Sequence, residues 1–148
     1  MQLLHCVMKK KSPRTPRTAT QAAAPTDFDT WLAGRFAEGG AFTALIVIMT
    51  VTESTVEPIA STYAHVIGGD IAWPQMAGLL DGSGKEWDAV VIFAAAMETG
   101  GAVPDESARL TLRRIEEEIL RDRRTINAGH FFDRLGRRMK LEEIGATH

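Results

Sequence analysis

The stretch Ala41–Val51, AFTALIVIMTV, decides how this chain folds. Apolar and β-branched side chains follow one another there without the polar alternation of a strand that faces water on one side. A strand of this composition is apolar on both faces, and both faces must therefore be covered. We predict that this stretch is a central strand of a sheet.

Two other segments predict neighbouring strands: TYAHVI at residues 62–67 and WDAVVIFAAAM at residues 87–97. The link between the first two strands is short, contains Pro58 and has no helical pattern, so we expect these strands to be antiparallel neighbours. The C-terminal sequence HFFDRLGRRMKLEEI predicts a short hairpin that turns at Leu135-Gly136.

Helical spacing of apolar residues occurs in three places. Thr26 is the expected N-cap of a helix that ends at Gly39-Gly40, and Trp73-Pro74 opens a short second helix. The longest helix is predicted from Pro104 to about Asn127. The inward positions of the three helices are Phe28, Trp31, Leu32 and Phe36; Met76, Leu79 and Leu80; and Ala108, Leu112, Ile115, Ile119 and Ile126.

These elements predict an α+β fold, in which an antiparallel or mixed sheet of about four to five strands is packed by a long C-terminal helix and two shorter helices. The chain has 148 residues, which suits a single domain, and we place that domain at residues 26–148. Residues 1–25 contain five basic side chains, no acidic one and three prolines, which predicts a disordered basic tail.

The formal net charge of -2 conceals a strong division along the chain. Residues 1–26 carry five basic and no acidic side chains, residues 27–108 carry two basic and twelve acidic ones, and residues 109–148 carry ten basic and seven acidic ones.

No apolar run is long enough for a membrane-spanning helix, and Cys6 is the only cysteine. We therefore expect a cytoplasmic protein with no membrane partner and no internal disulfide.

Four residues carry the chemistry of a possible catalytic or metal site: His65, Asp70, His130 and Asp133. Imidazole and carboxylate ligands could hold a divalent metal such as zinc, or a His–Asp pair could transfer protons. A purely structural interpretation is that His65 is a hydrogen-bonded strand residue and that Asp70 forms a turn. We predict no cofactor; an enzyme or metalloprotein that uses this set is the alternative.

The leading hypothesis is a small soluble domain without enzymatic activity that binds a protein partner or a second copy of itself. Its large aromatic residues exceed what a small core readily buries, and aromatic residues and arginine are typical interface anchors. We expect this interface at Trp31, Trp73, Phe131, Phe132, Arg137 and Arg138.

A second alternative is a nucleic-acid-associated protein that uses the basic tail and the C-terminal arginines. The cluster Arg134, Arg137, Arg138 and Lys140 has little acidic compensation nearby. The arginines of the long helix instead have glutamates four residues away, which favours mutual neutralisation on a solvated face. The acidic residues 27–108 would also repel phosphate groups.

Overall fold

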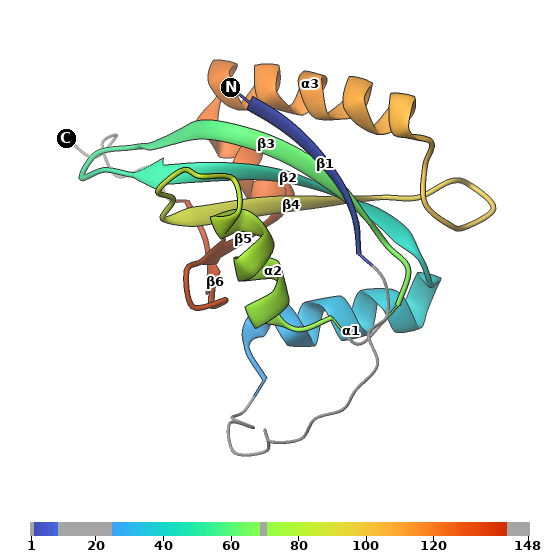
Figure 1. Ribbon diagram of the computed structural model, residues 1–148. Helices are drawn as coiled ribbons and strands as arrows, with labels where there is room; N and C mark the ends of the chain where they lie inside the picture. The colour runs from blue at the N-terminus through green and yellow to red at the C-terminus, as the bar shows by residue number, and fades with distance from the viewer. Residues whose placement is uncertain (1, 9–24, 69–70, 142–148) are drawn as a thin grey trace.

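A mixed six-stranded sheet forms the centre of the computed structural model, which describes residues 2–8, 25–68 and 71–141. The strand order is β1-β3-β2-β4-β5-β6, and β1 alone is parallel to its neighbour. Helices α1 and α2 cover one face of the sheet and α3 covers the other (Figure 1). The predicted α+β fold with a long third helix is confirmed.

The elements have the following bounds. The strands are β1 (Gln2–Met8), β2 (Phe42–Val51), β3 (Val56–Val66), β4 (Ala89–Ala95), β5 (His130–Asp133) and β6 (Arg138–Met139). The helices are α1 (Asp27–Gly39), α2 (Trp73–Asp81), α3 (Asp105–Arg121) and the 3-10 helix η2 (Arg123–Ala128).

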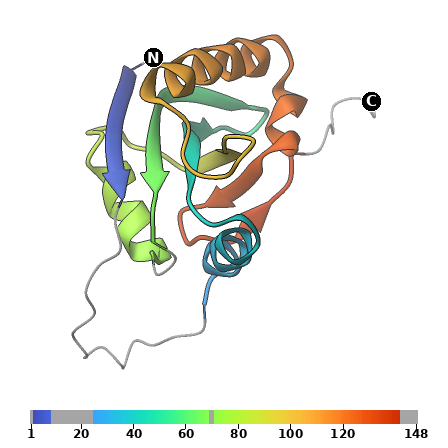
Figure 2. The ribbon, with the colours of Figure 1, turned by 90° about the vertical axis from the view of Figure 1, so that its right-hand side faces the viewer.

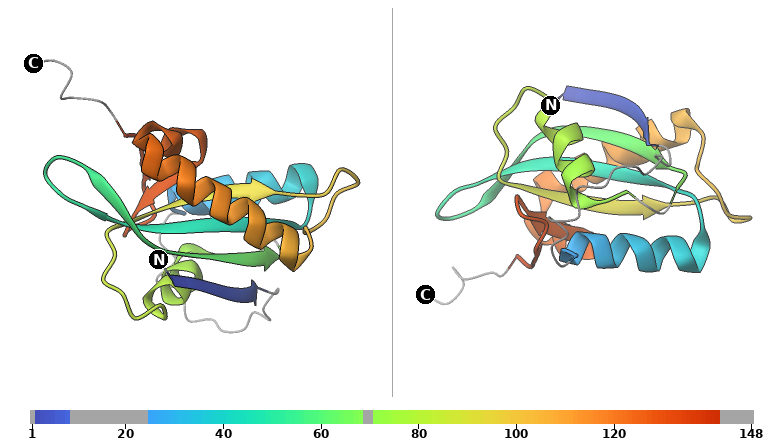
Figure 3. Two further views of the ribbon diagram at one scale, coloured as in Figure 1. Left: turned by 90° about the horizontal axis from the view of Figure 1, so that it is seen from above. Right: turned by 60° about the horizontal axis from the view of Figure 1, so that its bottom comes forward.

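Strand β2 divides its side chains between two hydrophobic cores. Ala44, Ile46 and Ile48 point toward α1 and α2, whereas Leu45, Val47 and Met49 point toward α3. All six side chains are buried, as the unbroken apolar stretch predicts. The view from above shows α3 lying across one face of the sheet, and the tilted view brings α1 and α2 forward on the other face (Figure 3).

The strands next to β2 are antiparallel to it, as expected for β3 from the short link. Strand β3 begins at Val56, however, and not at Thr62, so the expected connection already belongs to the sheet. Pro58 is tolerated because the pairing of β2 with β3 shifts register beside it, between Ile48 and Met49, and such a bulge accommodates proline in a strand.

The predicted starts of the helices agree with the structure, but the end of the longest one does not. Thr26 and Asp29 form a capping box at the start of α1. Helix α3 ends at Arg121, because Asp122 adopts an extended conformation and its carboxylate accepts the N–H of Arg124. The chain then continues as η2, so the predicted helix to Asn127 is two elements.

The two ends of the described chain complete the sheet. The C-terminal hairpin turns where predicted, with Gly136 at φ 78° and a hydrogen bond from its N–H to the Asp133 carbonyl. Gln2–Met8 lies within the segment expected to be disordered, but it forms the edge strand β1 beside β3 (Figure 2). A short uncharged apolar run can pair in this way, whereas residues 9–24 lie outside the described residues.

No helix within residues 2–8, 25–68 and 71–141 has the length and apolar character needed to span a bilayer.

Gly129→Ala should destabilise the fold by about 1–3 kcal/mol, because a methyl group there overfills a packed site. An added Cβ would lie 2.8 Å from both Phe93 Cε2 and Val91 Cγ2. Urea unfolding measures the change. The matched control is Gly34→Ala on the exposed side of α1, where nothing lies within 4 Å and where alanine should stabilise the helix by up to about 1 kcal/mol. Equal effects of the two substitutions would contradict the packing described here.

Candidate functional site

His65 lies on the α3 face of β3 and is held by hydrogen bonds at both ring nitrogens. Nδ1 is 2.9 Å from Thr43 Oγ1, and Nε2 is 2.6 Å from Asp105 Oδ1. The carboxylate can only accept, so Nε2 donates to it, while Nδ1 shares a hydrogen bond with the Thr43 hydroxyl. Thr43 Oγ1 itself accepts the Val103 N–H at 3.0 Å. These contacts link β2, β3 and the start of α3 in one hydrogen-bonded series.

More polar pairs join β3 to α3 and to η2 beyond His65. The Tyr63 hydroxyl accepts from Arg109 at 3.1 Å, Ser61 donates to Glu116, and Arg123 pairs with Glu57 at 2.7 Å. These contacts follow the antiparallel course of strand and helix. Burial raises the pKa of Tyr63, the negative charge of Asp105 adds to this, and the Arg109 guanidinium only partly opposes it. Tyr63 therefore stays protonated as part of the packing between sheet and helix.

The hydrogen-bonded series Thr43–His65–Asp105 contains the residue types of a catalytic triad, but a substrate cannot reach its hydroxyl group. The Thr43 side chain is 0% exposed, so its hydroxyl cannot reach a substrate. Both ring nitrogens of His65 already have hydrogen-bond partners within the protein. The arrangement instead fastens the residues before α3, and the first turn of α3, onto β2 and β3.

His65 and His130 do not share a site. His130 lies on the same face as Phe132, which packs in the α1 core, whereas His65 lies on the same face as Tyr63, which packs in the α3 core. Strands β2 and β4 separate their two strands, so three strand spacings of about 4.8 Å each add to the separation across the sheet.

The other two members of the predicted set do not complete a metal site either. Asp133 is used by the hairpin turn: its carboxylate accepts the N–H groups of Leu135 and Arg137 and pairs with the Arg137 guanidinium at 2.8 Å. Burial alone would raise the pKa of Asp133, but these contacts outweigh it and lower the pKa. Asp70 lies outside the described residues. In the part of the chain that is described, no three His, Cys, Asp or Glu side chains come together to bind a metal.

Three of the predicted interface residues belong to the cores. The exposed fractions of Trp73, Phe131 and Phe132 are 6%, 3% and 0%. Trp73 packs over Gly136 and donates its indole N–H to the Arg134 carbonyl. The two faces of a sheet covered on both sides absorb more aromatic side chains than a single core would, so these three are unavailable as anchors for a partner.

The structure brings together Trp31 and Arg138 from the predicted interface, and it adds His130 and Arg35. These four residues are called the Trp31 patch below. The rings of Trp31 and His130 stack with a centroid separation of 4.6 Å and an interplanar angle of 30°. Arg138 lies over Phe132 at 5.0 Å, with its Nη1 3.3 Å from His130 Nδ1. Arg35 lies over Phe42 at 4.7 Å.

The sequence gives a partial signal for this patch. Arg35 follows Trp31 by one helical turn, so both side chains leave α1 on the same side. The contribution of β5 and β6 could not be found from spacing, because it depends on which sheet face packs on α1.

Both guanidinium groups of the Trp31 patch lack a carboxylate partner among the described residues. The backbone N–H of Arg138 donates to Asp27 Oδ2 at 2.8 Å, whereas the Arg138 guanidinium lies over the Phe132 ring and beside His130 Nδ1. By contrast, Arg134 and Arg137 are paired with Asp81 and Asp133.

The patch borders an open hollow of about 310 Å³ that is lined by Asp27, Thr30, Trp31 and Arg138. It therefore offers a cation, an acceptor oxygen, a hydroxyl and an aromatic surface. The aromatic and cationic groups can hold a ligand that is both apolar and anionic.

The surroundings of His130 in the Trp31 patch favour its neutral form. Burial lowers its pKa below the usual 6.5, and the charges of Arg138 and Arg35 lower it further. The neutral ring accepts from Arg138 at Nδ1 and presents its face to Trp31.

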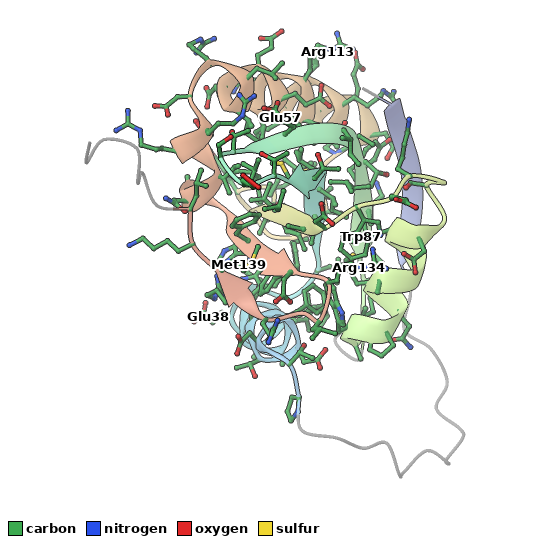
Figure 4. All side chains as sticks on the ribbon, turned by 90° about the vertical axis from the view of Figure 1, so that its left-hand side faces the viewer. Glu38, Glu57, Trp87, Arg113, Arg134 and Met139 are labelled. Carbon is green, nitrogen blue, oxygen red and sulfur yellow. The ribbon has the colours of Figure 1, made fainter. Side chains whose placement is uncertain are left out.

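The arginines of α3 do not form the ion pairs that their spacing predicts. Arg113, Arg114 and Arg121 are exposed, and none takes part in a salt bridge within the described chain. Exposed pairs of this kind gain too little to hold two long side chains together. Arg113 on α3 and Glu38 on α1 lie on opposite sides of the sheet, so the α3 arginines are remote from the Trp31 patch (Figure 4).

Thr43→Val should destabilise the protein by about 1–3 kcal/mol, because the Val103 N–H loses its buried acceptor. The same change removes the hydrogen-bond partner of His65 Nδ1. Thr43→Ser, which keeps the hydroxyl, is the control and should retain most of the stability. Thermal or urea unfolding of the two variants tests this, and similar losses in both would show that the methyl group, not the hydroxyl, matters.

No protein-family model, curated protein or solved structure matches this chain. The function of the Trp31 patch is therefore inferred from its residues and their geometry.

Proposed function

We propose that this chain is a non-enzymatic protein-interaction module that binds an acidic segment of a partner protein on the Trp31 patch. One observation carries the proposal: two guanidinium groups that have no carboxylate partner within residues 2–8, 25–68 and 71–141 lie beside a half-buried Trp–His stack. Stacking on aromatic rings keeps Arg35 and Arg138 ordered, so a carboxylate can bind them with little further loss of side-chain entropy.

The hollow beside the patch favours a peptide over a nucleic acid. Asp27 places an acceptor next to Arg138, and a peptide supplies both carboxylates and N–H donors, whereas a phosphate backbone supplies only acceptors. Most C-terminal arginines are also engaged within the protein: Arg109, Arg123, Arg124, Arg134 and Arg137 all contact acceptors of the same chain.

A partner protein is also favoured over an enzymatic role. The histidine with the most elaborate hydrogen bonding, His65, serves to fasten α3, and its companion hydroxyl is buried. We propose that the protein acts without a cofactor. We also propose a cytoplasmic location, which the single cysteine supports.

An N-acetylated peptide of alternating Glu and Leu should bind the full-length protein, and binding should weaken as salt is added. The double variant Arg35→Gln/Arg138→Gln should lower the affinity about five- to tenfold, because each exposed charge pair contributes a fraction of a kcal/mol to about 1 kcal/mol. Fluorescence anisotropy of the labelled peptide measures the affinity.

The matched control removes the same charge elsewhere: Arg113→Gln/Arg114→Gln on the exposed side of α3 should leave peptide binding nearly unchanged. Three further results would contradict the proposal: equal loss in both double variants, equal binding of a Gln-Leu peptide, or tighter binding of a single-stranded oligonucleotide. A fourth contradicting result would come from light scattering. If the native protein is a homodimer and the Arg35→Gln/Arg138→Gln variant is a monomer, the Trp31 patch binds a second copy of the chain and not an acidic segment of another protein.

A further inference from the structure

We infer that an anionic group bound at the Trp31 patch is accompanied by uptake of a proton on His130. This inference rests on the proposed function and concerns how pH regulates binding at the same patch. It concerns how the charges that surround one imidazole change when a carboxylate arrives.

The neighbours of His130 provide two positive charges. Helix α1 contributes Trp31 and Arg35, β4 contributes Ile92 directly opposite, and β6 contributes Arg138. Asp27, also on α1, accepts the backbone N–H of Arg138. Arg138 and Arg35 are the two charges that act on the ring.

In the free protein this environment keeps His130 neutral. A protonated ring would have to give up the hydrogen bond that Nδ1 accepts from Arg138, and it would lie beside two like charges. Partial burial adds to the cost of charging the ring. The free protein therefore holds an imidazole whose protonation is opposed by the same two arginines that attract an anion.

A bound carboxylate reverses this balance. It neutralises Arg138, or draws the guanidinium away from Nδ1, and it adds a negative charge beside the ring. Nδ1 is then free to carry a proton and to donate to the carboxylate, which makes a charge-assisted hydrogen bond. The pKa of His130 must therefore be higher in the complex than in the free protein.

The direction of the pH effect follows from linkage. Above both pKa values the ring is neutral in both states and the affinity does not change with pH. As the pH falls through the pKa of the complex toward that of the free protein, the affinity rises. The rise is at most tenfold for each unit by which the anion raises the pKa.

The experiment measures the affinity of the Glu-Leu peptide between about pH 8 and about pH 6, where histidine titrates and glutamate remains ionised. Binding should tighten about three- to tenfold over this range in the native protein. In His130→Gln, which keeps a polar side chain of similar size, the peptide should still bind, with an affinity that is independent of pH.

Nuclear magnetic resonance separates the two proposals. The imidazole signals of His130 should titrate at a higher pH with the peptide, and also with sulfate, which stays a dianion throughout. The signals of His65, on the other face of the sheet, should not respond to the peptide and serve as an internal reference.

Each outcome decides one statement or both. Peptide binding that is lost in Arg35→Gln/Arg138→Gln but does not vary with pH, with an unchanged titration of His130, overturns the proton coupling and leaves the proposed function standing. A pH dependence that persists in His130→Gln overturns the coupling as well. Failure of the peptide to bind, together with a titration of His130 that sulfate does not move, overturns both.

Discussion

The whole structure depends on covering β2 from both sides. An unbroken apolar strand cannot face water, so the chain must supply helices to both faces of the sheet. Helices α1 and α2 meet one set of alternate side chains, and α3 meets the other. This requirement also explains why Trp73, Phe131 and Phe132 are buried: two separate cores need large aromatic side chains on each side of one sheet.

The two faces are held differently, and this difference sets the location of the candidate site. On the α3 face the apolar core is accompanied by polar pairs along β3, including the Thr43–His65–Asp105 chain, whose hydrogen bonds are satisfied within the protein. On the α1 face the aromatic core extends to the surface at Trp31, and the cations there lack carboxylate partners in the described chain. Polar groups already paired internally have little left for a ligand, so the α1 face is where binding is favourable.

Histidine illustrates how residue type alone fails to identify function. His65 and His130 have the same chemistry and both lie in strands, and the sequence predicts a possible shared site for them. The structure gives one of them two hydrogen-bond partners in the protein, and it stacks the other on an indole ring near the charges of two arginines. The sequence alone could neither establish nor exclude a shared site. Whether the two histidines meet depends on the order of the strands in the sheet and on the sheet face to which each histidine points.

The sequence by itself determined the local elements: a central two-faced strand, the capped start of α1, the long third helix and the hairpin at Leu135-Gly136. These follow from apolar periodicity, caps and turn residues, which act over a few neighbouring positions. It misplaced the start of β3 and the end of α3, where a bulge beside Pro58 and the extended backbone of Asp122 prevailed over the pattern. Only the tertiary structure decided where the strands other than β2 and β3 lie in the sheet and which aromatic rings are buried. It alone also decided that Trp31, Arg35, His130 and Arg138 meet, because one residue of register reverses the face of every side chain in a strand.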